Sequence, residues 1–119
     1  MKYVLLIHQG ETPLPGTEAW EQLSEDEQRT VYADYQAINQ TPGVTPSDVW
    51  LESPEAATTV RVADGKTLTT DGPFVSVKEA LGGWLVYEAD DLDAAIELAS
   101  RIPAARMGGG LEVRPVKGQ

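Results

Sequence analysis

The stretch TDGPFVSVKE, residues 70–79, decides the layout of the chain because it joins two strand-like runs. It places an acid, a Gly-Pro bend and a neighbouring base and acid within ten residues. Glycine followed by proline ends regular structure and turns the backbone. Asp71 is therefore predicted to stand at the end of a strand, a position where functional side chains often converge.

A β-hairpin is predicted directly before this stretch. Residues 58–62 are rich in β-branched side chains, and Asp64-Gly65 is a two-residue turn of the kind that needs positive φ. The predicted register pairs three sets of residues: Ala63 with Lys66, Arg61 with Leu68, and Thr59 with Thr70. The return strand then delivers Asp71 at its end.

Four further strands are predicted. They cover residues 3–7, 48–53 around Trp50, 82–88 and 111–116. The first and third of these carry apolar side chains at both odd and even positions, so apolar groups point to both faces of the sheet. Both faces of that sheet should therefore be covered.

Two helices provide one cover. Ser24-Glu25-Asp26-Glu27 matches a capping box, in which Ser24 and Glu27 satisfy each other's backbone amides. A short helical turn capped by Thr17 is predicted before it, and a second long helix is predicted after Asp90 or Asp91. The apolar positions of the long helices are Val31, Tyr35 and Ile38 in the first, and Leu92, Ala95, Ala99 and Ile102 in the second.

The order strand, helix, strand, hairpin, strand, helix, strand predicts one domain over residues 1–119. Its class is α+β, a ferredoxin-like sandwich with an inserted β-hairpin. Two helices cover only one face, and the other would be a large exposed apolar patch. Two such sheets packed face to face in a homodimer, a dimeric α/β-barrel, would remove it. The alternative is a monomer that covers the face with its own hairpin and N-terminal loop.

Composition and charge exclude several classes of function. Nine basic against nineteen acidic residues give a net charge of −10, which favours solubility and opposes direct binding of nucleic acid. The absence of cysteine excludes disulfides, thiolate metal sites and cysteine nucleophiles. We expect neither a metal nor a cofactor. The apolar run at residues 1–7 is too short for a signal peptide or a membrane span, so a cytoplasmic location is expected.

Five motifs in order resemble one family. They are MKYVLLI at residues 1–7, ATTVR at 57–61, DGPF at 71–74, KE at 78–79 with GG at 82–83, and EVRP at 112–115. Over nearly its whole length the chain resembles the YCII-related family, and within it the DGPF-motif subgroup. Two positions depart from the subgroup: Ser76 replaces an acid, and His8 stands where tyrosine is frequent.

The resemblance implies a dimeric α+β barrel. In the wider family, a histidine and an aspartate that face a pocket suggest enzymatic activity. The subgroup itself is functionally uncharacterised, and some relatives lie beside or are fused to transcription sigma factors.

Asp71 and His8 are the candidate catalytic residues. Asp71 would act as a general acid or base, and His8, the only histidine, would shuttle a proton near neutral pH. Each also has a structural interpretation. Asp71 would instead accept hydrogen bonds from the turn before Gly72 and Pro73, and His8 would be a hydrogen-bonded residue at a strand end.

Three cations are candidates for binding an anionic substrate: Arg61, Lys78 and Arg114. Alternatively, Lys78 forms a surface pair with Glu79, and the arginines pair with Asp71 or Glu112. Gly72, Pro73, Phe74 and Glu79 are predicted to build the structural loop. The runs Gly82-Gly83 and Gly108-Gly109-Gly110 are predicted to allow a bend or a close backbone approach rather than to bind phosphate.

Two functions follow from these residues. The first is an enzyme that transfers a proton on a small anionic ligand. The alternative is a non-catalytic dimeric binding or regulatory module, linked to transcription through the relatives associated with sigma factors.

Overall fold

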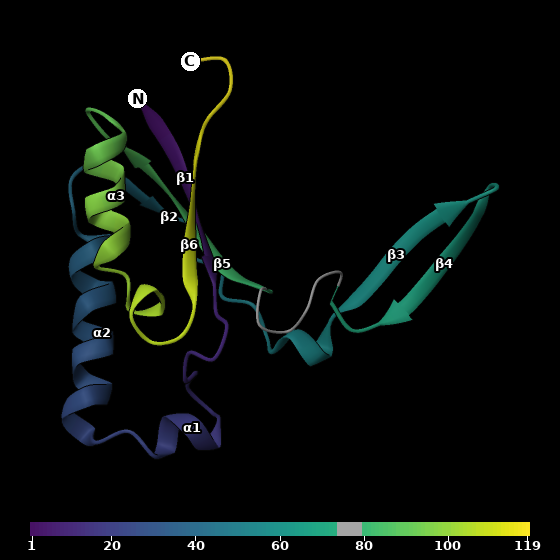
Figure 1. Ribbon diagram of the computed structural model, residues 1–119, viewed down its shortest axis with the longest axis horizontal. Helices are drawn as coiled ribbons and strands as arrows, with labels where there is room; N and C mark the ends of the chain where they lie inside the picture. The colour runs from purple at the N-terminus through teal and green to yellow at the C-terminus, as the bar shows by residue number, and fades with distance from the viewer. Residues whose placement is uncertain (74–79) are drawn as a thin grey trace.

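A four-stranded antiparallel sheet carries two helices on one face, and a separate hairpin extends from it (Figure 1). The computed structural model describes residues 1–73 and 80–119. The sheet has the order β2-β5-β1-β6. Its strands are β1 (Lys2–His8), β2 (Val44–Pro46), β5 (Leu81–Glu88) and β6 (Gly110–Pro115). The hairpin consists of β3 (Thr58–Ala63) and β4 (Lys66–Asp71).

The helices are α1 (Glu18–Glu21), α2 (Glu25–Asn39) and α3 (Leu92–Ser100), with 3-10 turns η1 (Pro54–Ala56) and η3 (Pro103–Ala105). Because β5 is antiparallel to both β1 and β2, the strands β1 and β2 run parallel around it, and α2 connects them. By the same logic β5 and β6 run parallel around β1, with α3 between them. The predicted α+β class with an added hairpin is confirmed.

Local signals form the helices as predicted. The Ser24 hydroxyl accepts from the Glu27 amide at 3.1 Å, and the Glu27 carboxylate accepts from the Ser24 amide at 3.0 Å. Asp91 caps α3 by accepting from the Ala94 amide at 2.8 Å. No helix within residues 1–73 and 80–119 has both the length and the apolar character to cross a membrane.

The predicted strand at residues 48–53 is wrong, because the second strand is Val44–Pro46. Asp48 has φ 58°, which turns the backbone out of the extended conformation after Pro46. The following segment lies along the edge of the sheet, where the Leu51 amide donates to the Gly82 carbonyl at 3.1 Å. Trp50 stands half-exposed against the side chain of Tyr35 instead of in a strand.

The predicted apolar stripe of α3 is wrong at its first position. Leu92 is 49% exposed, while Leu98 is fully buried together with Ala95 and Ile102. Leu92 is the first residue of the helix, and the buried stripe begins about one turn later, where the helix packs on the sheet.

The core lies between the helices and one face of the sheet. Tyr3, Leu5 and Ile7 of β1 are buried there, against Ile38 of α2 and Leu98 of α3. The alternate strand residues point to the opposite side, which we call the helix-free face. Its members are Lys2, Val4, Leu6 and His8 of β1, Thr45 of β2, Trp84, Val86 and Glu88 of β5, and Glu112 and Arg114 of β6.

The hairpin does not cover the helix-free face. It extends away from the body as an arm, residues 58–71 (Figure 1). All of its residues are exposed except Thr59, which is half-buried. The radius of gyration is 16.0 Å, whereas about 13.5 Å is typical of a compact chain of this length. The hairpin therefore does not provide the cover that the monomer alternative assigned to it together with the N-terminal loop (Figure 1).

The register of the arm is confirmed at all three predicted pairs, Ala63 with Lys66, Arg61 with Leu68, and Thr59 with Thr70. Asp64 and Gly65 form the turn with φ values of 51° and 74°. These positive values match the twist of a two-residue hairpin turn, which glycine and aspartate tolerate better than most residues.

Candidate functional site

His8 ends the central strand β1 on the helix-free face. Its Nε2 lies 3.3 Å from Oε1 of Glu112 on the neighbouring strand β6. The other carboxylate oxygen of Glu112 lies 3.5 Å from Nε of Arg114. One carboxylate therefore joins the imidazole to a guanidinium, and the pairing of Arg114 with Glu112, one of the predicted alternatives, is observed.

An apolar surface lies beside these three polar residues. Leu6 faces both Trp84 and Glu112 across the strands, and Val4 faces both Val86 and Arg114. The four apolar residues of this surface, Val4, Leu6, Trp84 and Val86, are only partly buried. Both faces of β1 and β5 are thus apolar at their centres, as the sequence predicts.

The geometry suits proton transfer. A carboxylate only accepts hydrogen bonds, so the His8 Nε2 must carry the proton that points at Glu112. An imidazole held against a carboxylate is an arrangement that general acid–base catalysis uses. Arg114 adds a cation for an anionic group on the same face.

Asp71 lies in a different sheet from His8. It is the last residue of β4, exposed at the base of the arm. The next residue, Gly72, has φ 103°. Its amide donates to the Ala57 carbonyl at 2.7 Å, and its carbonyl accepts from the Thr59 hydroxyl at 2.8 Å. Backbone groups therefore hold the bend after Asp71.

The remaining predicted site residues lie either at the arm or outside the described residues. Arg61 lies on β3 of the arm, opposite Leu68, and Pro73 follows the bend. Phe74, Lys78 and Glu79 lie outside the described residues. Within one chain, the structure brings together His8 and Arg114 but places Asp71 and Arg61 in the arm. In the described part of the chain, no three His, Asp or Glu side chains are grouped so that they could hold a metal ion.

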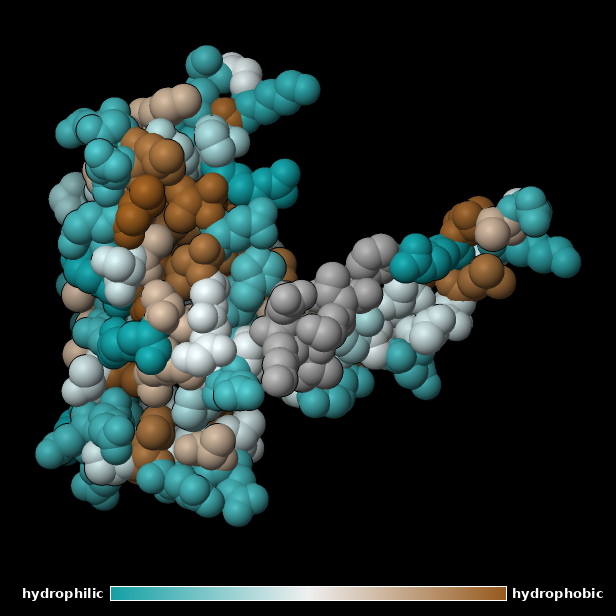
Figure 2. Space-filling view, in the orientation of Figure 1, coloured by the Kyte–Doolittle hydropathy of each residue, from teal (hydrophilic) through white to brown (hydrophobic). Residues whose placement is uncertain are grey.

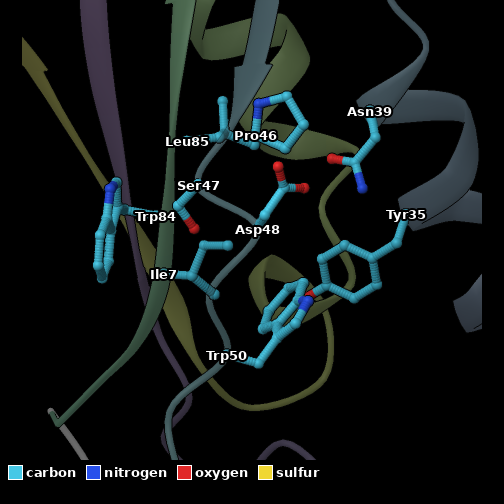
Figure 3. A pocket seen from close by; sticks show the side chains of 9 residues that line it. All are labelled: Ile7, Tyr35, Asn39, Pro46, Ser47, Asp48, Trp50, Trp84 and Leu85. Atoms are coloured by element: carbon cyan, nitrogen blue, oxygen red, sulfur yellow. The ribbon is translucent and has the colours of Figure 1, made fainter.

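A shallow hollow on the helix side was missed from the sequence. Figure 3 shows Tyr35, Asn39 and Asp48 turned toward one another around it, with Trp50 beside Tyr35 and the Trp84 ring pointing away. It holds about 330 Å³ of empty space, open solvent included. The rings of Tyr35 and Trp50 meet edge to face, 5.1 Å apart at 82°. Sequence reasoning missed it because it placed Trp50 in a strand.

Burial raises the pKa of Tyr35 to about 12, although the charge of Arg106 acts in the opposite direction. The phenol therefore stays protonated at neutral pH. Asp48 and Asn39 are exposed at the rim, so their polar atoms are open to solvent. The helix-free face, with His8 fixed by Glu112, is the stronger candidate site.

The fold and this face define a small α+β protein with a histidine–carboxylate pair on an open antiparallel sheet. Comparison with known proteins agrees: residues 1–118 match the model of the YCII-related domain, and the chain belongs to that family. An uncharacterised protein of Rhizobium meliloti (strain 1021) is 32% identical over 120 residues, which cover 98% of this chain and 92% of that protein.

Proposed function

We propose that this YCII-related protein is a small-molecule enzyme of the DGPF-motif subgroup, and that His8 transfers a proton on an anionic substrate. The observation that carries the proposal is the arrangement of His8, Glu112 and Arg114 on one apolar sheet face. Elimination, isomerisation and hydrolysis are the reaction classes that a single positioned base with a nearby cation can promote.

Each residue has a defined role in this proposal. Glu112 accepts from the His8 Nε2–H and orients the ring, and the imidazole exchanges the proton with the substrate. Arg114 binds the anionic group of the substrate, with Lys78 as a further candidate for that contact. Asp71 is the second acid–base group and reaches the site across the seam of a dimer.

A second copy of the chain completes the site in this proposal. Val4, Leu6, Trp84 and Val86 form an apolar surface that two identical copies can bury against each other. The resulting dimer is an α/β-barrel in which the two sheets pack face to face. Burial under a partner sheet would exclude water from His8 and strengthen its contact with Glu112.

The test uses a mixture of small mono- and dicarboxylates incubated with the protein in D2O. Proton transfer exchanges a carbon-bound hydrogen of the substrate for deuterium or converts the substrate, and NMR detects either change whatever the product is. His8→Gln should slow the change by about 10²–10⁴-fold, the usual contribution of a positioned acid–base group. Arg114→Gln should raise KM.

The matched control is Arg101→Gln. This arginine pairs with Glu97 on the outside of α3, away from the helix-free face, so its loss should leave the exchange unchanged. Exchange that is equally fast in the His8→Gln variant would refute the proposed role of His8.

The alternative is a non-catalytic dimeric binding or regulatory module, linked to transcription as the sigma-factor-associated relatives suggest. The exposure of Asp71 and the backbone hydrogen bonds of Gly72 favour it, because backbone groups rather than the Asp71 carboxylate hold the bend at Gly72. Under this alternative, Asp71→Asn alters the melting temperature or the dimer dissociation constant, and no carboxylate exchanges deuterium.

A further inference from the structure

The arm has two chemically different faces. In an antiparallel pair, residues directly opposite each other share a face. The pairing of β3 with β4 therefore sorts the arm into two sets. The first, the valine face, holds Thr58, Val60, Val62, Thr67, Thr69 and Asp71, and the second, the cationic face, holds Thr59, Arg61, Ala63, Lys66, Leu68 and Thr70.

The valine face is β-branched along its whole length and charged only at its base. Val60 and Val62 are 59% and 69% exposed. Figure 2 shows apolar side chains on the arm, well away from the apolar side chains of the body. A two-stranded hairpin alone is at best marginally stable in water, and β-branched side chains contribute to a sheet mainly by packing. A surface of this composition is typical of a strand pair that packs on another molecule.

The distribution of charge favours a second copy of this chain as the partner of the arm. The chain carries −10, and a second copy is repelled wherever that excess lies. The arm, however, has two cations and two anions, Arg61, Lys66, Asp64 and Asp71. The helix-free face is balanced in the same way by Lys2, Arg114, Glu88 and Glu112.

The whole excess of negative charge therefore lies outside these two surfaces. A basic partner would be attracted to the acidic remainder and would gain nothing from a neutral arm. A second, equally acidic copy of this chain is repelled by the acidic remainder. It can approach the arm and the helix-free face with the least repulsion, because each of these surfaces has no net charge.

We propose that each arm clasps a second copy of the chain through its valine face, with the cationic face turned to solvent. The proposal rests on the homodimer of the proposed function and adds an interface to it. In a two-fold dimer both arms make the same contact, so the valines of both copies are buried at once. The arm is then ordered by its partner rather than by its own body.

The test compares two lysine substitutions on opposite faces of the same hairpin. Val62→Lys places a charge on the valine face, and Leu68→Lys places one on the cationic face, where Leu68 is 51% exposed. Sedimentation velocity over a concentration series gives the dimer dissociation constant of each protein. We expect Val62→Lys to raise it at least about tenfold, as for a charge buried without a partner, and Leu68→Lys to leave it within about threefold because that face is solvated.

Two further variants keep the result interpretable. The double variant Val60→Thr, Val62→Thr retains β-branched shape and strand propensity, so it tests the interface even where Val62→Lys disturbs the arm itself. Far-UV circular dichroism and urea unfolding at low concentration report whether each monomer is folded. Trp84→Lys tests the helix-free face separately.

The outcomes separate the two proposals. A dimer weakened by the valine variants and by Trp84→Lys supports both. A dimer weakened by Trp84→Lys but not by the valine variants overturns the clasp and leaves the face-to-face dimer. Weakening by the valine variants alone supports the clasp and overturns the face-to-face barrel. Equal weakening by Val62→Lys and Leu68→Lys overturns the assignment of faces, and a wild-type protein that stays monomeric overturns both proposals.

Discussion

Gly109 lies where the chain returns to the sheet beside His8, and alanine there should destabilise the protein. A Cβ at Gly109 would lie 2.3 Å from the carbonyl oxygen of His8 and 2.6 Å from that of Gln9. Ordinary contacts of this kind need roughly 3.5 Å, so the backbone must move by about an ångström. Neither atom belongs to a side chain that could turn away.

The cost follows from two opposing effects. Overpacking that forces a backbone shift costs about 1–3 kcal/mol, and the reduced entropy of the unfolded chain returns about 0.4–1 kcal/mol. Gly109→Ala should therefore lower the free energy of unfolding by about 1–2 kcal/mol, which urea denaturation resolves. At about 4 °C per kcal/mol, the melting temperature should fall by about 4–8 °C.

The neighbouring glycine is the matched control. At Gly110 a Cβ would meet nothing within 4 Å, so Gly110→Ala should be neutral or stabilise by up to about 1 kcal/mol. The uncertainty of such comparisons is about 0.5 kcal/mol. If the free energies of unfolding of the two variants differ by less than that, close backbone approach is not the reason for glycine at position 109.

Two further predictions concern titration and capping. Because burial raises the pKa of Tyr35 to about 12 from 10.0, its neutral phenol contributes stability that is present below pH 10 and lost as pH rises through 12. The free energy of unfolding of the wild type should therefore fall more over this alkaline range than that of Tyr35→Phe, by up to about 2–3 kcal/mol. Urea denaturation at a series of pH values measures the difference. Ser24→Ala removes the capping box of α2 and should cost about 1 kcal/mol at neutral pH, measured by thermal unfolding. The hydrogen bonds from the Ser24 amide and hydroxyl lower the pKa of Glu27 in the folded protein from its ordinary value of 4.5. The contribution of the capping box to stability is therefore present above pH 4.5 and should fade as the pH falls through the lowered pKa of the folded protein.

Several elements were predictable because their signals are local. The capping box depends on Ser24 and Glu27, three residues apart, and the hairpin register depends on the turn at Asp64 and Gly65. The strand at residues 48–53 failed for the opposite reason. Trp50 looks like a strand residue by composition, but the left-handed Asp48 turns the chain toward Tyr35.

The candidate site was predictable only in part. His8 was identified from its place at the end of an apolar strand, yet its carboxylate partner Glu112 lies 104 positions away in the chain. Asp71, predicted as its catalytic companion, belongs to the other sheet. Which side chains meet on the helix-free face depends on the register between strands that are distant in sequence.

The amino-acid sequence by itself determined the helices and their caps, the hairpin and the two-sided apolar character of β1, since each depends on residues a few positions apart. Only the tertiary structure decided that Glu112 lies against His8 and that the arm points away from the sheet, so that it does not cover the helix-free face (Figure 1). Those features arise from packing between distant segments, and no periodicity within one segment encodes where another segment will lie.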